Sequence, residues 1–94
     1  MKNRAKSQST FVVLNDKGLH TRPSTELVKC ASRFRCQITL YYQDLSVNAK
    51  SLLGILMLAA SRGAKIRIEA EGEDSEDAIR AILMLAEKKF NIRF

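Results

Sequence analysis

Two short stretches in which apolar and polar residues alternate strictly constrain the fold of this chain most. Over residues 36–43, apolar or aromatic side chains at Cys36, Ile38, Leu40 and Tyr42 are separated by Gln37, Thr39, Tyr41 and Gln43. Over residues 65–71, Ile66, Ile68 and Ala70 alternate with charged residues. A period of two places alternate side chains on opposite faces of a strand. Both stretches therefore predict half-buried strands of a sheet that is covered on one side.

Two weaker strand signals accompany these stretches. The run "TFVVL" at residues 10–14 is rich in strand-forming residues and is followed by "NDKG", a typical turn sequence. A second turn, at "DL", leads into residues 46–48. The sequence therefore predicts four strands.

Three segments show the spacing of amphipathic helices. The first is expected to begin near Arg22 or Pro23, because proline fits the first turn of a helix. Ser51 is an expected N-cap for the apolar run at 52–60, which we expect Gly63 to end. A third helix should follow a cap at Asp74 or Ser75. The side chains expected to face the core are Leu27, Cys30, Ala31 and Phe34 in the first helix and Ala78, Ile79, Ile82, Leu83, Ala86 and Phe90 in the third.

The order of these elements, β-α-β-β-α-β-α, predicts an α+β fold. We expect an open-faced β-sandwich, with a four-stranded antiparallel sheet and three helices on one face. The length of 94 residues suits a single domain. Residues 1–9 are basic and polar and predict a flexible arm, which leaves residues 10–94 as the domain.

Composition excludes several classes of protein. The longest apolar run, residues 52–60, is shorter than the roughly 20 residues that span a bilayer, and the N-terminus does not resemble a secretory signal. We therefore expect a cytoplasmic protein without membrane insertion. We also expect it to be a monomer. Cys30 and Cys36 match no common zinc spacing and are expected to be buried, reduced thiols, so no metal or cofactor is expected.

The heptapeptide "GLHTRPS" at residues 18–24 holds the only histidine and the only proline of the chain. The start of a helix carries unpaired N–H groups and a partial positive charge, which favour an anion. A phosphoryl group on His20 would meet these N–H groups and the guanidinium of Arg22. A solvated loop histidine without a function is the alternative that this pattern alone leaves open.

Three segments, in the same order, resemble the HPr family of histidine-containing phosphocarriers of the bacterial phosphotransferase system. "GLHTRPS" is similar to the family signature "GLHARPA". "VNAKSLLGILML" at 47–58 resembles the family motif around a regulatory serine, and "GAKIRIEAEGEDSEDAI" at 63–79 resembles the closing strand, turn and last helix. The likeness covers about residues 10–90.

The resemblance implies specific roles and partners. His20 would be phosphorylated on Nδ1, the pros nitrogen, by enzyme I and would pass the phosphoryl group to enzyme IIA proteins. Arg22 would be the arginine of the active site, and Ser51 the serine that an HPr kinase/phosphorylase modifies. The protein would then be a carrier and a substrate of other enzymes. Thr21 departs from the alanine that is usual in the family.

The helix after Ser51 carries more apolar side chains than one buried face can hold. If Ile55 and Leu58 point into the core, Leu52 and Leu56 remain exposed beside Ser51, and such patches mark transient docking sites. We therefore expect partners to dock on Thr21, Leu52, Leu53 and Leu56. A helix that is wrapped on all sides, or buried in a homodimer, is the alternative.

Two other functions compete with a carrier of sugar transport. A regulatory relative that does not serve sugar transport would have the same motifs. The pI of about 9.7 and the adjacent Tyr41 and Tyr42 would suit a small nucleic-acid-binding domain. Such domains need aromatic residues on adjacent central strands, and the strand at 65–71 presents charges instead. We therefore expect no nucleic acid among the partners.

Overall fold

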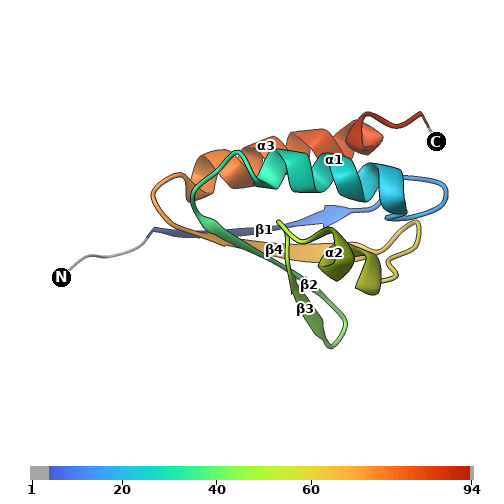
Figure 1. The fold of residues 1–94 in the computed structure, drawn as a ribbon, viewed down its shortest axis with the longest axis horizontal. Helices are drawn as coiled ribbons and strands as arrows, with labels where there is room; N and C mark the ends of the chain where they lie inside the picture. The colour runs from blue at the N-terminus through green and yellow to red at the C-terminus, as the bar shows by residue number, and fades with distance from the viewer. Residues whose placement is uncertain (1–4, 94) are drawn as a thin grey trace.

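The computed structural model describes residues 5–93 and contains one four-stranded sheet with the helices on one of its faces (Figure 1). The element order expected from the sequence is confirmed, with a short 3-10 turn, η1, added after the last helix. The elements are β1 (Lys6–Val12), α1 (Thr21–Ala31), β2 (Gln37–Tyr42), β3 (Leu45–Asn48), α2 (Leu52–Met57), β4 (Lys65–Glu71), α3 (Ser75–Glu87) and η1 (Lys89–Asn91).

The sheet has the strand order β1-β4-β2-β3, and every neighbouring pair is antiparallel. The two strictly alternating stretches form β2 and β4, which are the central strands. Their register places Ile38 beside Ala70 and Leu40 beside Ile68. All four side chains are buried, so the apolar face of each strand points toward the helices as expected.

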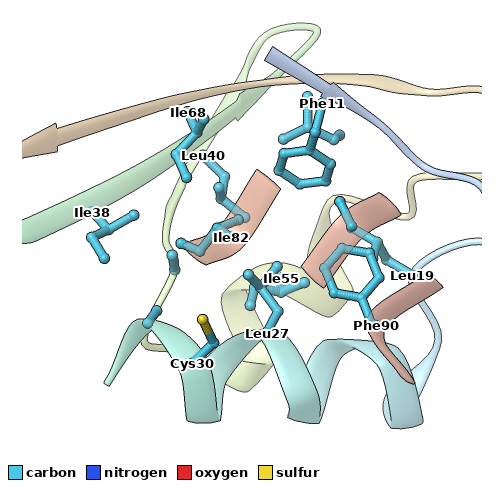
Figure 2. Packing of buried hydrophobic residues seen from close by; sticks show 14 of the residues in the cluster. Phe11, Leu19, Leu27, Cys30, Ile38, Leu40, Ile55, Ile68, Ile82 and Phe90 are labelled. Atoms are coloured by element: carbon cyan, nitrogen blue, oxygen red, sulfur yellow. The ribbon is translucent and has the colours of Figure 1, made fainter. Parts of the chain in front are cut away.

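The core fills the space between the sheet and α1 and α3. Figure 2 shows Leu27 of α1 and Ile82 of α3 pointing toward Leu40 and Ile68 of the sheet. Phe90 packs edge-to-face on Phe11 of β1, with ring centroids 5.9 Å apart. Both thiols are free and buried, as expected. Among the described residues, no helix is long and apolar enough to cross a bilayer.

The first strand begins earlier than expected. Residues 6–9 belong to β1 and pair with β4 from Lys6 opposite Glu71 onward, so the arm predicted for residues 1–9 is wrong over this part. Residues 1–4 lie outside the described residues. Ser7 and Ser9 face inward in register with Phe11, and Ser7 Oγ lies 3.2 Å from Ser75 Oγ. Because serines occupy the inward positions, the alternation carries no hydrophobic signal.

The first helix starts at Thr21, next to Arg22, as expected. One helix end differs from the expectation. The second helix ends at Met57, and the chain reverses at Ala59, whose φ is 50°, instead of continuing toward Gly63.

Asp74 precedes α3 but does not cap it with its side chain. Its carboxylate accepts hydrogen bonds from the backbone N–H groups of Arg35 (2.8 Å) and Cys36 (3.0 Å), and thereby ties the start of β2 to α3. The hydrogen bond from the backbone N–H of Arg35 is the main cause that holds the pKa of Asp74 below its ordinary value of 3.8.

The Cys36 thiol has a raised pKa of about 11. Its burial is the main cause, and the carboxylate of Asp74 is the second, so this thiol is protonated and unreactive at neutral pH.

Replacing Asp74 by asparagine should flatten the acid limb of the stability curve. Because the pKa of Asp74 is lower in the folded protein, the folded state binds fewer protons than the unfolded state near pH 3.8. The stabilisation is complete well above that pH and is lost as the pH falls through the folded pKa. Urea midpoints between about pH 7 and pH 2.5 should fall less for Asp74→Asn than for the parent protein. Equal acid slopes would contradict this assignment.

Candidate functional site

His20 occupies the N-cap of α1 and is exposed. Its backbone carbonyl accepts from Ser24 N at 3.0 Å, which closes the first turn, while its side chain makes no capping hydrogen bond. The backbone N–H groups of Thr21 and Arg22 begin the helix and have no partner within it, and Pro23 has no N–H to leave unpaired. The imidazole therefore stands at the positive end of α1 with its nitrogens available.

The loop before His20 is held against the segment that follows α2. Gly18 has a φ of +73°, and Leu19 N donates to Ala60 O at 2.9 Å. Leu19 is buried, and its carbonyl accepts from Ser24 Oγ at 3.0 Å. These bonds fix the backbone on which His20 stands, so the position of the imidazole depends on the loop after α2.

A second support comes from the C-terminal turn, which the sequence did not predict. Lys89, Phe90 and Asn91 all have positive φ, from 54° to 64°, and buried Asn15 donates from Nδ2 to Lys89 O at 2.9 Å. The sequence predicts that Phe90 lies on the buried stripe of the last helix. It is buried, but from this left-handed turn instead. The turn leads the chain to Ile92, beside the histidine.

Two shallow hollows meet at His20 and Thr21. One, of about 240 Å³, is lined also by Arg22, Pro23 and Ile92. The other, of about 390 Å³, is lined also by Leu56 of α2 and by Ala60 and Ser61. The fold thus brings the start of α1 together with the end of α2, which are more than thirty residues apart in the sequence.

Two cations border the histidine. Arg22 is exposed, and within residues 5–93 its guanidinium pairs with no carboxylate. Lys17 lines both hollows. Its place in the turn "NDKG" gave no chemical signal, because a lysine in a turn is ordinarily solvated. Together they make the surroundings of His20 favourable for an anion.

Ser51 caps α2 as predicted, since its Oγ accepts from Gly54 N at 3.0 Å. Ile55 and Leu58 are buried, as expected. The other apolar residues of α2 form an α2 patch, whose members are Leu52, Leu53, Leu56 and Met57. Leu53 and Met57 are 68% and 63% exposed, whereas Leu56 is half-buried. Met57 therefore joins the three leucines expected from the sequence, and the alternative of a helix wrapped within its own chain is wrong.

In the part of the chain from residue 5 to residue 93, no group of three or more histidine, cysteine, aspartate or glutamate side chains is placed to hold a metal ion. The site at the start of α1 offers an exposed imidazole beside cations and helix N–H groups.

Comparison with known proteins gives a consistent result. A sequence family described as "PTS HPr component phosphorylation site" matches residues 7–88. The phosphocarrier protein HPr of Xylella fastidiosa is 42% identical over 81 residues, which cover 86% of this chain and 91% of that protein. The crystal structure of HPr-C-His from Thermoanaerobacter tengcongensis superposes with a TM-score of 0.88 at 40% identity and covers 94% of this chain and 99% of that one. An HPr dimer from the same organism has a TM-score of 0.73 at 41% identity and covers 96% and 98%.

Proposed function

Because this chain belongs to the HPr family of phosphocarrier proteins of the phosphotransferase system, we propose that His20 accepts a phosphoryl group from enzyme I and passes it to an enzyme IIA protein. The observation that carries this proposal is the position of His20. The imidazole is exposed at the start of α1 and its side chain takes no part in capping the helix. The protein acts as a carrier that other enzymes load and unload.

In the loading step, a lone pair of His20 Nδ1 attacks phosphorus. The Nδ1–P bond forms as the bond between phosphorus and its donor on enzyme I breaks. The donor keeps that electron pair and takes up a proton, while Nε2 of His20 releases its proton to solvent. The product adds close to two negative charges beside the N–H groups at the start of α1, Arg22 and Lys17. These groups are close to solvent, where each such interaction is worth about 1 kcal/mol or less. The phosphoryl group is therefore stabilised without being trapped.

The test is to incubate the parent protein and His20→Ala with phosphoenolpyruvate and enzyme I of the same organism and to measure intact mass. The parent should gain one phosphoryl group that is labile to acid and stable to base, and the variant should gain none. A folded parent protein that gains no adduct would refute the proposal. An adduct that no enzyme IIA removes would instead favour the regulatory function, in which the same histidine serves a different acceptor.

We propose that both partners dock on the α2 patch, next to His20. Leu56 lines a hollow with the histidine, and Leu53 and Met57 present apolar surface beside it. Exposed apolar area of this kind is typical of transient interfaces. Docking there would place the partner's reacting group against the imidazole.

Leu53→Ser and Met57→Ser should each raise the KM for the protein in its phosphorylation by enzyme I by about 5- to 30-fold, because each loses roughly 1 to 2 kcal/mol of apolar contact. Stability should change by only about 0.5 kcal/mol, since both side chains are mostly exposed. Met84→Ser is the matched control, because Met84 is 53% exposed but lies on α3. A KM that rises equally in all three variants would refute docking on the α2 patch.

Ser51 lies at the start of the same patch, and we propose that it is the regulatory phosphorylation site, modified by an HPr kinase/phosphorylase. Its Oγ accepts a hydrogen bond from Gly54 N, and the residue is partly exposed. A phosphate there would remain favourable for α2 itself. It would add charge to a surface on which an apolar partner docks.

The geometry of the tyrosines argues against nucleic-acid binding. Tyr41 and Tyr42 are consecutive on β2 and therefore point to opposite faces of the sheet. The guanidinium of Arg67 lies 3.9 Å above the centre of the Tyr41 ring, and Tyr41 Oη lies 3.2 Å from Glu69 Oε1. One face of the Tyr41 ring is thus already occupied by a cation of the protein itself.

A further inference from the structure

The helical face of the molecule carries a second apolar hollow, away from His20. It lies between α1 and α3, which run side by side over the sheet (Figure 1), and it encloses about 430 Å³. Its apolar lining comes mainly from α3. Met84 of this helix lies outside the core and is 53% exposed. We call this hollow the α1–α3 groove. The residues that line it are Glu26, Lys29, Cys30, Arg33, Ala81, Met84, Leu85, Lys88 and Asn91.

The charged residues that line the groove are mainly positive and come from both α1 and the end of α3. Lys29 and Arg33 border it on the α1 side and Lys88 on the α3 side, against a single carboxylate, Glu26, which pairs with Lys29 at 3.3 Å. Arg33 is held in place, because its guanidinium donates to Cys30 Sγ at 3.8 Å and lies 5.9 Å from the centre of the Phe34 ring. A cation that is already ordered loses less entropy when it binds an anion.

We propose that the α1–α3 groove docks an acidic amphipathic helix of another protein. An apolar strip bordered by cations along α1 and at the end of α3 is complementary to a helix whose apolar stripe is flanked by carboxylates. The groove is bounded by helices and offers no strand edge, so an extended peptide would find no backbone partners there, whereas a helix satisfies its own backbone. The groove is concave, so it can receive side chains at positions i and i+4 of a helix. A flat lipid surface would fit this shape less well.

This groove is separate from the surface proposed for phosphoryl transfer. Helix α1 contacts α3 on one flank and α2 on the other, so α1 lies between the groove and the α2 patch. No residue that lines the groove lines either hollow at His20. A protein bound in the groove would leave the histidine accessible, and the carrier could engage it while it is loaded or unloaded.

The test uses a synthetic helical peptide with leucines at i, i+4 and i+7 and glutamates on both sides of that stripe, together with a twin in which lysines replace the glutamates. NMR shifts of the parent protein on titration should change along the groove, at residues 26–33 and 81–91, for the glutamate peptide only. The double variant Arg33→Glu/Lys88→Glu should bind this peptide at least about tenfold more weakly, and Met84→Ser about threefold more weakly. Leu53→Ser on the α2 patch is the control and should bind like the parent.

Several results would overturn the proposal. These are equal binding of both peptides, shift changes centred on α2, or binding of the parent to vesicles containing anionic phosphatidylglycerol without binding of the glutamate peptide. The first would mean unspecific apolar contact, and the last a membrane surface. Phosphorylation of His20 by enzyme I should stay at the parent rate in Arg33→Glu/Lys88→Glu, which also shows that the variant is folded. This proposal therefore stands or falls independently of the carrier function.

Discussion

Gly18→Ala should destabilise the protein by about 2 to 5 kcal/mol, a large share of the stability of a small domain. The backbone at Gly18 has a φ of +73°, where a side chain costs roughly 1 to 2 kcal/mol. A Cβ atom there would also lie 2.2 Å from Ala60 O and 2.9 Å from Ser61 Cα. Both are backbone atoms that cannot rotate away, so the two loops would have to separate. Urea unfolding of the parent and the variant measures this difference.

Gly63→Ala provides the matched control. Its φ of +89° imposes a similar backbone cost, but a Cβ atom at Gly63 would have no neighbour within 4 Å. We expect this variant to lose only about 1 to 2 kcal/mol. If Gly18→Ala and Gly63→Ala were equally destabilising, the close approach to Ala60 would not be what fixes the loop.

Gly18→Ala should also impair phosphoryl acceptance in the molecules that remain folded. Leu19 N donates to Ala60 O, and His20 follows directly, so a separation of the loops moves the imidazole away from Leu56 and the α2 patch. Measured on folded protein, kcat/KM with enzyme I should fall for Gly18→Ala and stay at the parent value for Gly63→Ala. A parent-like kcat/KM in both would mean that the loop contact serves stability alone.

The features that could be predicted from the sequence are those encoded within a few residues. The alternation in β2 and β4 fixes which side chains face the core, and Ser51 caps α2 through a bond to a residue three positions away. The motif around His20 is equally local, because helix start, histidine and arginine are contiguous. Each of these signals is complete within a single element, so no knowledge of the fold was needed to interpret it.

The features that could not be predicted depend on contacts between distant segments. Asp74 has the sequence position of a cap, but its carboxylate binds the backbone of residues 35 and 36, which compete for the same oxygens. The left-handed turn at 89–91 is supported by Asn15 from the other end of the chain. Lys17 becomes part of the site only because the loop folds against the end of α2. No local pattern announces such contacts.

Ser51→Asp should lower kcat/KM for phosphorylation of His20 by enzyme I roughly 30- to 160-fold. An unpaired carboxylate within an apolar interface is expected to cost about 2 to 3 kcal/mol when the partner docks. The substitution should leave the fold intact, because aspartate caps a helix about as well as serine and its charge is favourable at the start of α2. The loss should therefore appear mainly as a raised KM, with the urea midpoint unchanged.

Ser51→Asn separates the charge from the change in shape. Asparagine is close to aspartate in size and also accepts from the N–H of Gly54, but it carries no charge. If charge on the docking surface is the cause, the asparagine variant should be phosphorylated within about threefold of the parent rate. Added salt should reduce the loss caused by aspartate only in part, because the carboxylate is desolvated when the partner docks. Equal losses for aspartate and asparagine would show that Ser51 acts through packing, and a phosphate there would then inhibit by its size. Parent-like rates in both would mean that partners do not cover Ser51, and that its phosphorylation could not regulate transfer by blocking the docking surface.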